Sequence, residues 1–236
     1  MRTALALLLS LGQTLCAATM YINWDGNTNT FASPHKVYLM GDSITGTSGK
    51  YGTMLQTLLG ADWQVVWKGV SGDHTLDMRT RFITDVISPG DAEYVVVQGG
   101  VNDISGNHAE SETEGTLQAM YDWARTARIK VVSVNITPFY GTAWADAPRL
   151  VKQANENAWQ LNTSSNVSYR VDAYSALVDP ATPYTLLPAY DSGDHLHLST
   201  AGYAALATNI YNAVTWTPKI GSTNSITADL TDIWSH

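Results

Sequence analysis

Short apolar runs alternate along the chain with segments in which apolar residues recur at helical spacing. Strand-like runs lie at residues 36–40, 64–67, 93–97, 130–134 and, less clearly, 169–172. Between them, amphipathic helices are predicted by three sets of apolar side chains: Tyr51, Met54, Leu55 and Leu58; Leu117, Met120, Tyr121 and Ala124; Val151, Ala154, Ala158 and Leu161. Strands that alternate with helices predict an α/β domain in which helices cover both faces of a parallel sheet.

The chain divides into one domain and two flanking segments. Residues 1–18 have the pattern of a signal peptide, with Arg2, an apolar stretch over residues 4–11 and small residues before a cleavage point at Ala18. We expect residues 19–35 to form an N-terminal extended arm, residues 36–215 the α/β domain, and residues 216–236 a C-terminal tail. A secreted protein is therefore predicted, and a hydrophobic helix that stays attached is the alternative.

The negative net charge of the chain makes some classes of binding partner unfavourable. Its 21 acidic and 13 basic residues give a formal net charge of −8, and such a surface repels nucleic acid and anionic membranes. We expect no nucleic-acid partner, no stable membrane association, and a monomer that acts on a neutral small-molecule or carbohydrate substrate. Cys16 is the only cysteine and lies in the predicted signal peptide, so the exported form would have no disulfide.

Polar residues follow three of the predicted strands and precede the last predicted helix. In parallel sheets the carboxyl ends of the strands border the ligand crevice, so residues that follow different strands meet at one edge. Four blocks of sequence supply them: Gly41-Asp42-Ser43-Ile44, Val70-Ser71-Gly72-Asp73, Gly100-Val101-Asn102-Asp103 and Asp194-His195-Leu196-His197.

Taken in order, these four blocks resemble those of the GDSL, or SGNH, hydrolase family, and the resemblance covers residues 36 to about 214. It implies a flavodoxin-like three-layer α/β/α sandwich with a five-stranded parallel sheet, and hydrolysis of esters without a cofactor or metal. By position, it implies Ser43 as nucleophile, His197 as general base and Asp194 as the carboxylate that orients the base. It also implies an oxyanion hole of the backbone N–H groups of Ser43 and Gly72 and the side-chain amide of Asn102.

The chemistry of the residue types supports these roles. A serine hydroxyl needs an imidazole to take its proton, and the imidazole needs an acceptor on its other nitrogen. Asp194 and His197 are three residues apart in a predicted loop, so one local turn can join them. Glycine at position 72 lets a backbone N–H approach the substrate, and the Asn102 amide is a neutral donor suited to a developing oxyanion.

Some of these residues also allow other interpretations. His195 is a second candidate base, although the three-residue spacing from Asp194 favours His197; Asp191 could pair only with His195, at a four-residue spacing. Ser43, Gly72 and Asn102 could each be ordinary cap or turn residues. Two further features are read as structural: Asp42 as a brace of the turn, and the string Ser105-Gly106-Asn107-His108 as a polar loop.

Parts of the sequence also resemble proteins of two other functions. His and Asp residues near His74, His108 and His195 echo fragments of dinuclear metallophosphoesterases, but Asp42 has no histidine two residues after it. A non-catalytic carbohydrate-binding protein is suggested by the 8 Trp and 12 Tyr, although most of these aromatics fall on predicted helices or strands.

We therefore predict a secreted serine esterase that hydrolyses short-acyl or carbohydrate-linked acetyl esters through an acyl-enzyme intermediate. The chain has little room for a large lid, which favours short acyl groups over long lipid chains.

Overall fold

The computed structural model describes residues 21–22, 28–29, 34–46 and 50–215. The expected signal peptide, residues 1–18, and the expected tail, residues 216–236, lie outside these ranges, as does most of the expected arm. Within the arm, β1 (Tyr21–Ile22) and β2 (Thr28–Asn29) pair in antiparallel fashion.

Five parallel strands form the central sheet, and all five lie where the apolar runs predict them. Their order is β4-β3-β5-β6-β7. The first strand in the chain, β3, thus has β4 on one side and β5, β6 and β7 in succession on the other. This is the flavodoxin-like order that the resemblance implies, and it places a crevice where the direction reverses at β3. The strands are β3 (His35–Gly41), β4 (Trp63–Gly69), β5 (Tyr94–Gln98), β6 (Lys130–Val134) and β7 (Tyr169–Val171).

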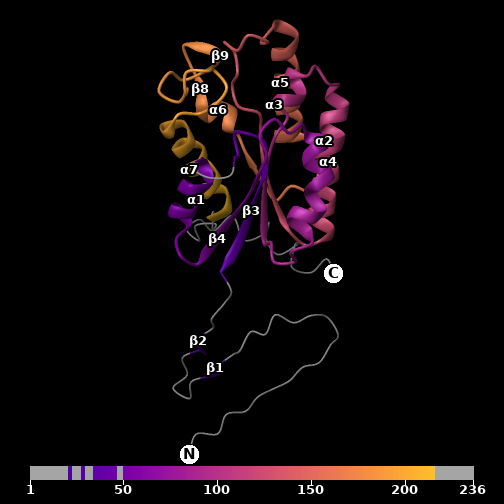
Figure 1. Cartoon of the computed structure of the whole chain (residues 1–236), viewed down its shortest axis with the longest axis vertical. Helices are drawn as coiled ribbons and strands as arrows, with labels where there is room; N and C mark the ends of the chain where they lie inside the picture. Colours follow the sequence, from indigo (N-terminus) through magenta and orange to yellow (C-terminus); the bar gives the residue numbers. More distant parts are fainter. Residues whose placement is uncertain (1–20, 23–27, 30–33, 47–49, 216–236) are drawn as a thin grey trace, which may run out of the picture.

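Helices cover both faces of the sheet, so the predicted three-layer sandwich is confirmed (Figure 1). Successive residues of β3 face opposite layers: Val37 and Leu39 pack with α1 and α7, while Tyr38 and Met40 pack with α2 and α4. Because both faces are covered, every residue of β5 is buried. The helices of the layers are α1 (Tyr51–Leu59), α2 (Thr75–Phe82) with the π-helical turn η1 (Ile83–Ile87), α4 (Glu110–Thr126), α5 (Ala147–Asn162) and α7 (Thr200–Thr215).

Shorter elements gather at the end of the domain where the parallel strands finish (Figure 1). A short helix, α3, follows β5 directly, and α6 follows β7. An antiparallel hairpin then leads towards the last helix. These elements are α3 (Val101–Ser105), α6 (Ala173–Leu177), β8 (Val178–Asp179) and β9 (Thr182–Leu186).

Helix α5 departs from the usual amphipathic arrangement. The predicted helix is present, but its buried residues are polar: Gln153, Glu156, Asn157 and Gln160. Leu150 and Trp159 pack against the core, but several other apolar residues lie outward, and Val151 is 59% exposed. The buried amides instead bind the chain that follows β6: Asn157 Oδ1 accepts the N–H of Ile136, and Gln153 Nε2 donates to the carbonyl oxygen of Thr137. The buried amides of α5 therefore position this loop.

Among the helices of the described ranges, none combines the length and the apolar character that crossing a membrane requires.

Candidate active site

Ser43 lies in a tight turn directly after β3, at the carboxyl edge of the sheet. A Cβ at Gly41 would come within 2.0 Å of Thr45 Oγ1, so no larger residue fits before the turn. Asp42 is fully buried, and its carboxylate accepts the N–H of Ile44 at 2.9 Å. These contacts fix the turn and leave the side chain of Ser43 partly exposed at the crevice.

His197 reaches this hydroxyl from the other end of the chain. The distance from Ser43 Oγ to His197 Nε2 is 2.8 Å, and His197 Nδ1 lies 2.6 Å from Asp194 Oδ2. One ring nitrogen thus faces the hydroxyl and the other faces the carboxylate, as proton transfer from a serine requires. The structure therefore brings Ser43, His197 and Asp194 into one hydrogen-bonded chain.

The loop before α7 holds Asp194 in place. Its Oδ1 accepts the N–H groups of Leu196 and His197 and the hydroxyl of Ser192. Burial acts to raise the pKa of Asp194, but hydrogen bonds from the His197 ring and from these donors outweigh burial and hold the pKa well below its usual range. The carboxylate thus stays ionised at any pH at which His197 could act as a base.

Besides the N–H of Ser43, two further oxyanion donors are expected, and they lie on helix α3 and on the turn after β4, which a hydrogen bond joins. Asn102 is the second residue of α3, and its Nδ2 donates to the carbonyl oxygen of Asp73 at 2.9 Å. One N–H of the amide is thereby fixed, and the geometry of the group leaves the second N–H in a set direction. Gly72 precedes Asp73 in a turn with a φ of +83°, a conformation that favours glycine. A Cβ at Gly72 would meet no atom within 4 Å, so backbone conformation rather than space selects glycine there.

Arg81 is a residue of this region that the sequence analysis did not identify. From α2, its guanidinium donates to the carbonyl oxygens of Gly41 and Lys68, at the ends of β3 and β4. Its Nε donates to Asp73 Oδ2 at 2.8 Å. One side chain thus ties the strand before Ser43 to the loop that carries Gly72. Local spacing indicates only its ion pair with Asp85, four residues later; its contacts with the carbonyl oxygens of Gly41 and Lys68 join segments that are distant in sequence.

A second histidine–aspartate pair lies beside the first. His195 Nδ1 is 2.7 Å from Asp191 Oδ2, the pairing that a four-residue spacing allows. The His195 ring is half exposed, and it packs so closely on Gly141 that a Cβ there would lie 2.8 Å from the ring. It is His197, not His195, that contacts Ser43.

Three buried carboxyl groups lie behind the crevice. Burial raises the pKa of Asp42 to about 7 and that of Glu156 to about 9. Burial also raises the pKa of Asp103, whose carboxylate accepts the N–H and hydroxyl of Thr75. Each of these groups therefore favours its neutral form more than an exposed carboxyl does.

The histidines that suggest a metallophosphoesterase and the aromatics that suggest a carbohydrate-binding protein lie in surroundings that do not favour these functions. Among residues 34–46 and 50–215, no three His, Cys, Asp or Glu side chains gather in an arrangement that could hold a metal ion. His74 and His108 instead stack, with ring centroids 4.7 Å apart. Of the aromatics considered above, Tyr121 is fully buried and its ring stacks on that of Trp159, as core packing requires.

Comparison with known proteins identifies similar folds and one family. The profile of the GDSL-like Lipase/Acylhydrolase family matches residues 39–205. A GDSL-like lipase from Bacteroides thetaiotaomicron superposes with a TM-score of 0.62 at 26% identity, over 76% of this chain and 89% of that chain. An acetylxylan esterase from Geobacillus stearothermophilus, solved as a catalytic mutant, superposes with a TM-score of 0.65 at 22% identity, over 79% of this chain and 97% of that chain. Comparison with curated proteins gives no match.

Proposed function

Because the chain belongs to the GDSL-like lipase/acylhydrolase family and is thus an ester hydrolase, we propose that it is a secreted serine esterase with Ser43 as its nucleophile. The observation that carries this proposal is the hydrogen-bonded chain from Ser43 Oγ through the His197 ring to Asp194. In the relative from Geobacillus stearothermophilus, catalytic mutants replace a serine, a histidine and an aspartate three residues before that histidine. Asp194 and His197 have the same spacing.

The first half of the reaction forms an acyl-enzyme. His197 Nε2 takes the hydroxyl proton while Ser43 Oγ bonds to the ester carbonyl carbon, whose oxygen becomes an oxyanion. The tetrahedral intermediate then collapses: the bond to the alcohol oxygen breaks, and that oxygen receives the proton from His197. Asp194 stabilises the imidazolium that forms between these steps and does not itself take the proton.

The second half regenerates the enzyme with water. His197 removes a proton from a water molecule as the water oxygen bonds to the acyl carbon, and the second tetrahedral intermediate releases the carboxylic acid and restores the Ser43 hydroxyl. In both halves the N–H groups of Ser43 and Gly72 and the Asn102 amide stabilise the oxyanion. The hydrogen bond from Asn102 to Asp73 supports this role, because it orients the amide before substrate arrives.

We propose short acyl groups, including acetyl groups on carbohydrates, as the substrates. The fold neighbour from Geobacillus stearothermophilus is an acetylxylan esterase. The short elements at the carboxyl edge of the sheet are the hairpin β8–β9 and the helices α3 and α6. Each of these strands and helices has five residues or fewer. Such short elements support a small acyl site better than one for a long chain.

Hydrolysis of p-nitrophenyl esters of increasing acyl length tests this function. We expect acetate and butyrate to be the best substrates, and we expect Ser43→Ala to abolish their hydrolysis. A wild-type enzyme that prefers long acyl chains would overturn the proposed specificity, and a Ser43→Ala variant with wild-type activity would overturn the proposed nucleophile.

Export is proposed from the sequence pattern of residues 1–18. Expression of the full chain followed by mass measurement of the protein in the medium tests it. A mature protein that begins at Thr19 is expected, and a product that stays in the cell with residues 1–18 attached would contradict it.

A further inference from the structure

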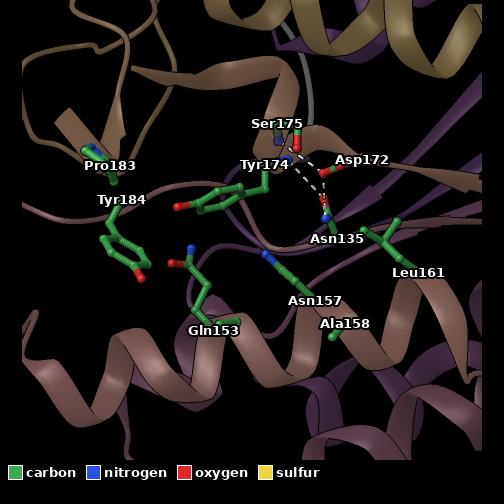
Figure 2. Close-up of a pocket in the computed structure, with 11 residues that line it drawn as sticks. Asn135, Gln153, Asn157, Ala158, Leu161, Asp172, Tyr174, Ser175, Pro183 and Tyr184 are labelled. Carbon is green, nitrogen blue, oxygen red and sulfur yellow. Dashed lines mark hydrogen bonds between the residues drawn. The ribbon is translucent and has the colours of Figure 1, made fainter. Parts of the chain in front are cut away.

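A cavity of about 390 Å³ lies beside the carboxyl ends of β6 and β7, apart from the Ser43 crevice. Helix α5 forms one wall, and Tyr174 of α6 and Tyr184 of β9 form the other (Figure 2). None of the residues named for the catalytic chain or the oxyanion hole lines it. Its volume falls in the range of roughly 300–1,000 Å³ that is usual for small-ligand sites.

The chemistry of the lining excludes an anionic ligand. None of its 11 residues carries a positive charge. Its one carboxylate, Asp172, is engaged in hydrogen bonds from the N–H of Ser175 and from Asn135 Nδ2. The remaining polar groups are mostly amides and phenols, which bind neutral hydroxyl groups.

One polar atom of the cavity lacks a partner. Gln153 is 1% exposed, and its Nε2 donates to Thr137, but its Oε1 is buried without a hydrogen-bond donor among the described residues. Figure 2 shows this amide directed from α5 towards the rings of Tyr174 and Tyr184. Because an unpaired buried oxygen destabilises the fold, a ligand hydroxyl that donates to it would be bound favourably.

The apolar part of the lining comes from the outward face of α5. Ala154, Ala158 and Leu161, whose spacing predicted the helix, line the cavity instead of the core. Across from them stands Tyr184, 38% exposed and with a φ of +72°, a strained conformation for a tyrosine. Strain of this kind is often held at binding sites. The rings of Tyr174 and Tyr184 lie edge to face, with centroids 6.5 Å apart.

The loop after β6 connects the cavity to the catalytic region. At the cavity end, Gln153 binds Thr137 and the carbonyl oxygen of Tyr184 accepts the N–H of Tyr140 at 2.9 Å. At the other end, Gly141 packs against the ring of His195, two residues from His197. Strands β6 and β7 lie two and three places from β3 in the sheet, so the cavity is roughly 10–14 Å along the edge from the strand before Ser43.

We propose that this cavity binds a neutral sugar ring of an oligosaccharide whose ester group reacts at Ser43. A sugar ring has an apolar C–H face that packs on Tyr184 and the alanines of α5, and a hydroxyl group that donates to Gln153 Oε1. The separation along the sheet edge requires a ligand of more than one ring. The inference rests on the proposed esterase function only for the reaction at Ser43; the sugar binding itself does not require it.

Titration calorimetry on the Ser43→Ala protein tests the binding without turnover, with xylotetraose and cellotetraose as probes. Three second substitutions are compared in this background. Tyr184→Asn removes the ring while keeping a residue that tolerates a positive φ. Ala154→Phe fills the cavity from α5. Val151→Ala, on an exposed part of the same helix and outside the lining, is the matched control. Thermal unfolding of each variant shows that it is folded.

We expect Ser43→Ala to bind at least one of the two probes, Tyr184→Asn and Ala154→Phe to weaken that binding by about tenfold, and Val151→Ala to leave it unchanged. No binding of either probe, or equal binding by all three variants, would overturn the proposal. Ala154→Phe is also made alone in the otherwise wild-type protein, which keeps Ser43. Loss of hydrolysis of long-acyl p-nitrophenyl esters by that protein, with normal sugar binding by the double variant, would assign the cavity to an acyl chain and also overturn the proposal. Hydrolysis of p-nitrophenyl acetate by the wild type tests the esterase function separately.

Discussion

The guanidinium of Arg81 donates a hydrogen bond of 2.9 Å to the carbonyl oxygen of Gly41, two residues before Ser43. The same side chain binds Lys68 O and the carboxylate of Asp73, whose backbone carbonyl in turn accepts the Asn102 amide. One cation therefore fixes the relative positions of the proposed nucleophile and two of the proposed oxyanion donors. Arg81 acts as a positioning residue, since its hydrogen bonds go to groups beside Ser43 and Asn102 rather than to these residues themselves.

Substitution Arg81→Met should lower kcat by about 10–100-fold with little change in KM, because the donors shift relative to Ser43 when the clamp is lost. Unfolding should also become easier by about 1–3 kcal/mol, since two carbonyl groups lose a charged donor. Steady-state kinetics and urea unfolding measure the two effects. Arg79→Met, on the same helix without these contacts, is the control, and an equal loss of kcat in both variants would refute the positioning role.

The Asp194→Asn variant should lose about 10⁴-fold in kcat, because an amide does not hold the imidazole in the required tautomer or stabilise its charged form. Asp191→Asn is the matched control, since Asp191 pairs with His195 rather than His197. Kinetics on p-nitrophenyl acetate compare the two. A larger loss in Asp191→Asn would transfer the role of base to His195.

Removal of the Asn102 amide in Asn102→Ala should reduce kcat by about 10²–10³-fold, the usual effect of losing one oxyanion donor. Ser105→Ala on the same short helix serves as the control for a general disturbance of α3. If Asn102→Ala raised KM and left kcat unchanged, the amide would bind the ground state rather than the oxyanion.

Stability should fall as the pH rises, because Glu156 is buried among Asp103, Glu110 and Glu114. Burial first, and then these negative charges, raise the pKa of Glu156 from 4.5 to about 9, so the folded state keeps a proton that the unfolded state releases. Between these pH values the free energy of unfolding decreases with rising pH, by up to about 1.4 kcal/mol per unit.

Glu156→Gln removes the titrating group and should flatten this dependence, so that the variant gains stability over the wild type between pH 7.5 and 8.5. Urea unfolding at several pH values in this range measures the slope, and comparison of the two proteins cancels the contribution of Asp42, which both contain. Identical slopes for the two proteins would show that Glu156 is ionised in the folded state.

Much of the fold followed from the sequence because its strands are short, apolar and well separated. Runs such as residues 130–134 are buried on both faces of the sheet, and a parallel strand in this position is typically a nearly continuous apolar run in the sequence. The face that α5 buries could not be predicted in this way. Its polar residues Gln153 and Asn157 bind backbone groups of the loop after β6, and such long-range partners leave no periodic signal.

The candidate site was predictable where local spacing sets the geometry. Asp194 and His197 are joined by one turn, so their contact could be predicted, whereas the approach of His197 to Ser43 could be expected only from the resemblance. Arg81 and the cavity near Tyr184 depend on chain segments brought together by the sheet order. The sequence alone therefore predicted neither the role of Arg81 nor the cavity.

Covalent labelling with a fluorophosphonate, followed by peptide mass mapping, tests the central assignment most directly. The account predicts a single adduct on Ser43 in the wild-type protein and no adduct in Ser43→Ala. Because His197 must activate the hydroxyl, His197→Ala should label far more slowly. An adduct on another serine of the wild type, or labelling of Ser43→Ala at the wild-type rate, would contradict the account.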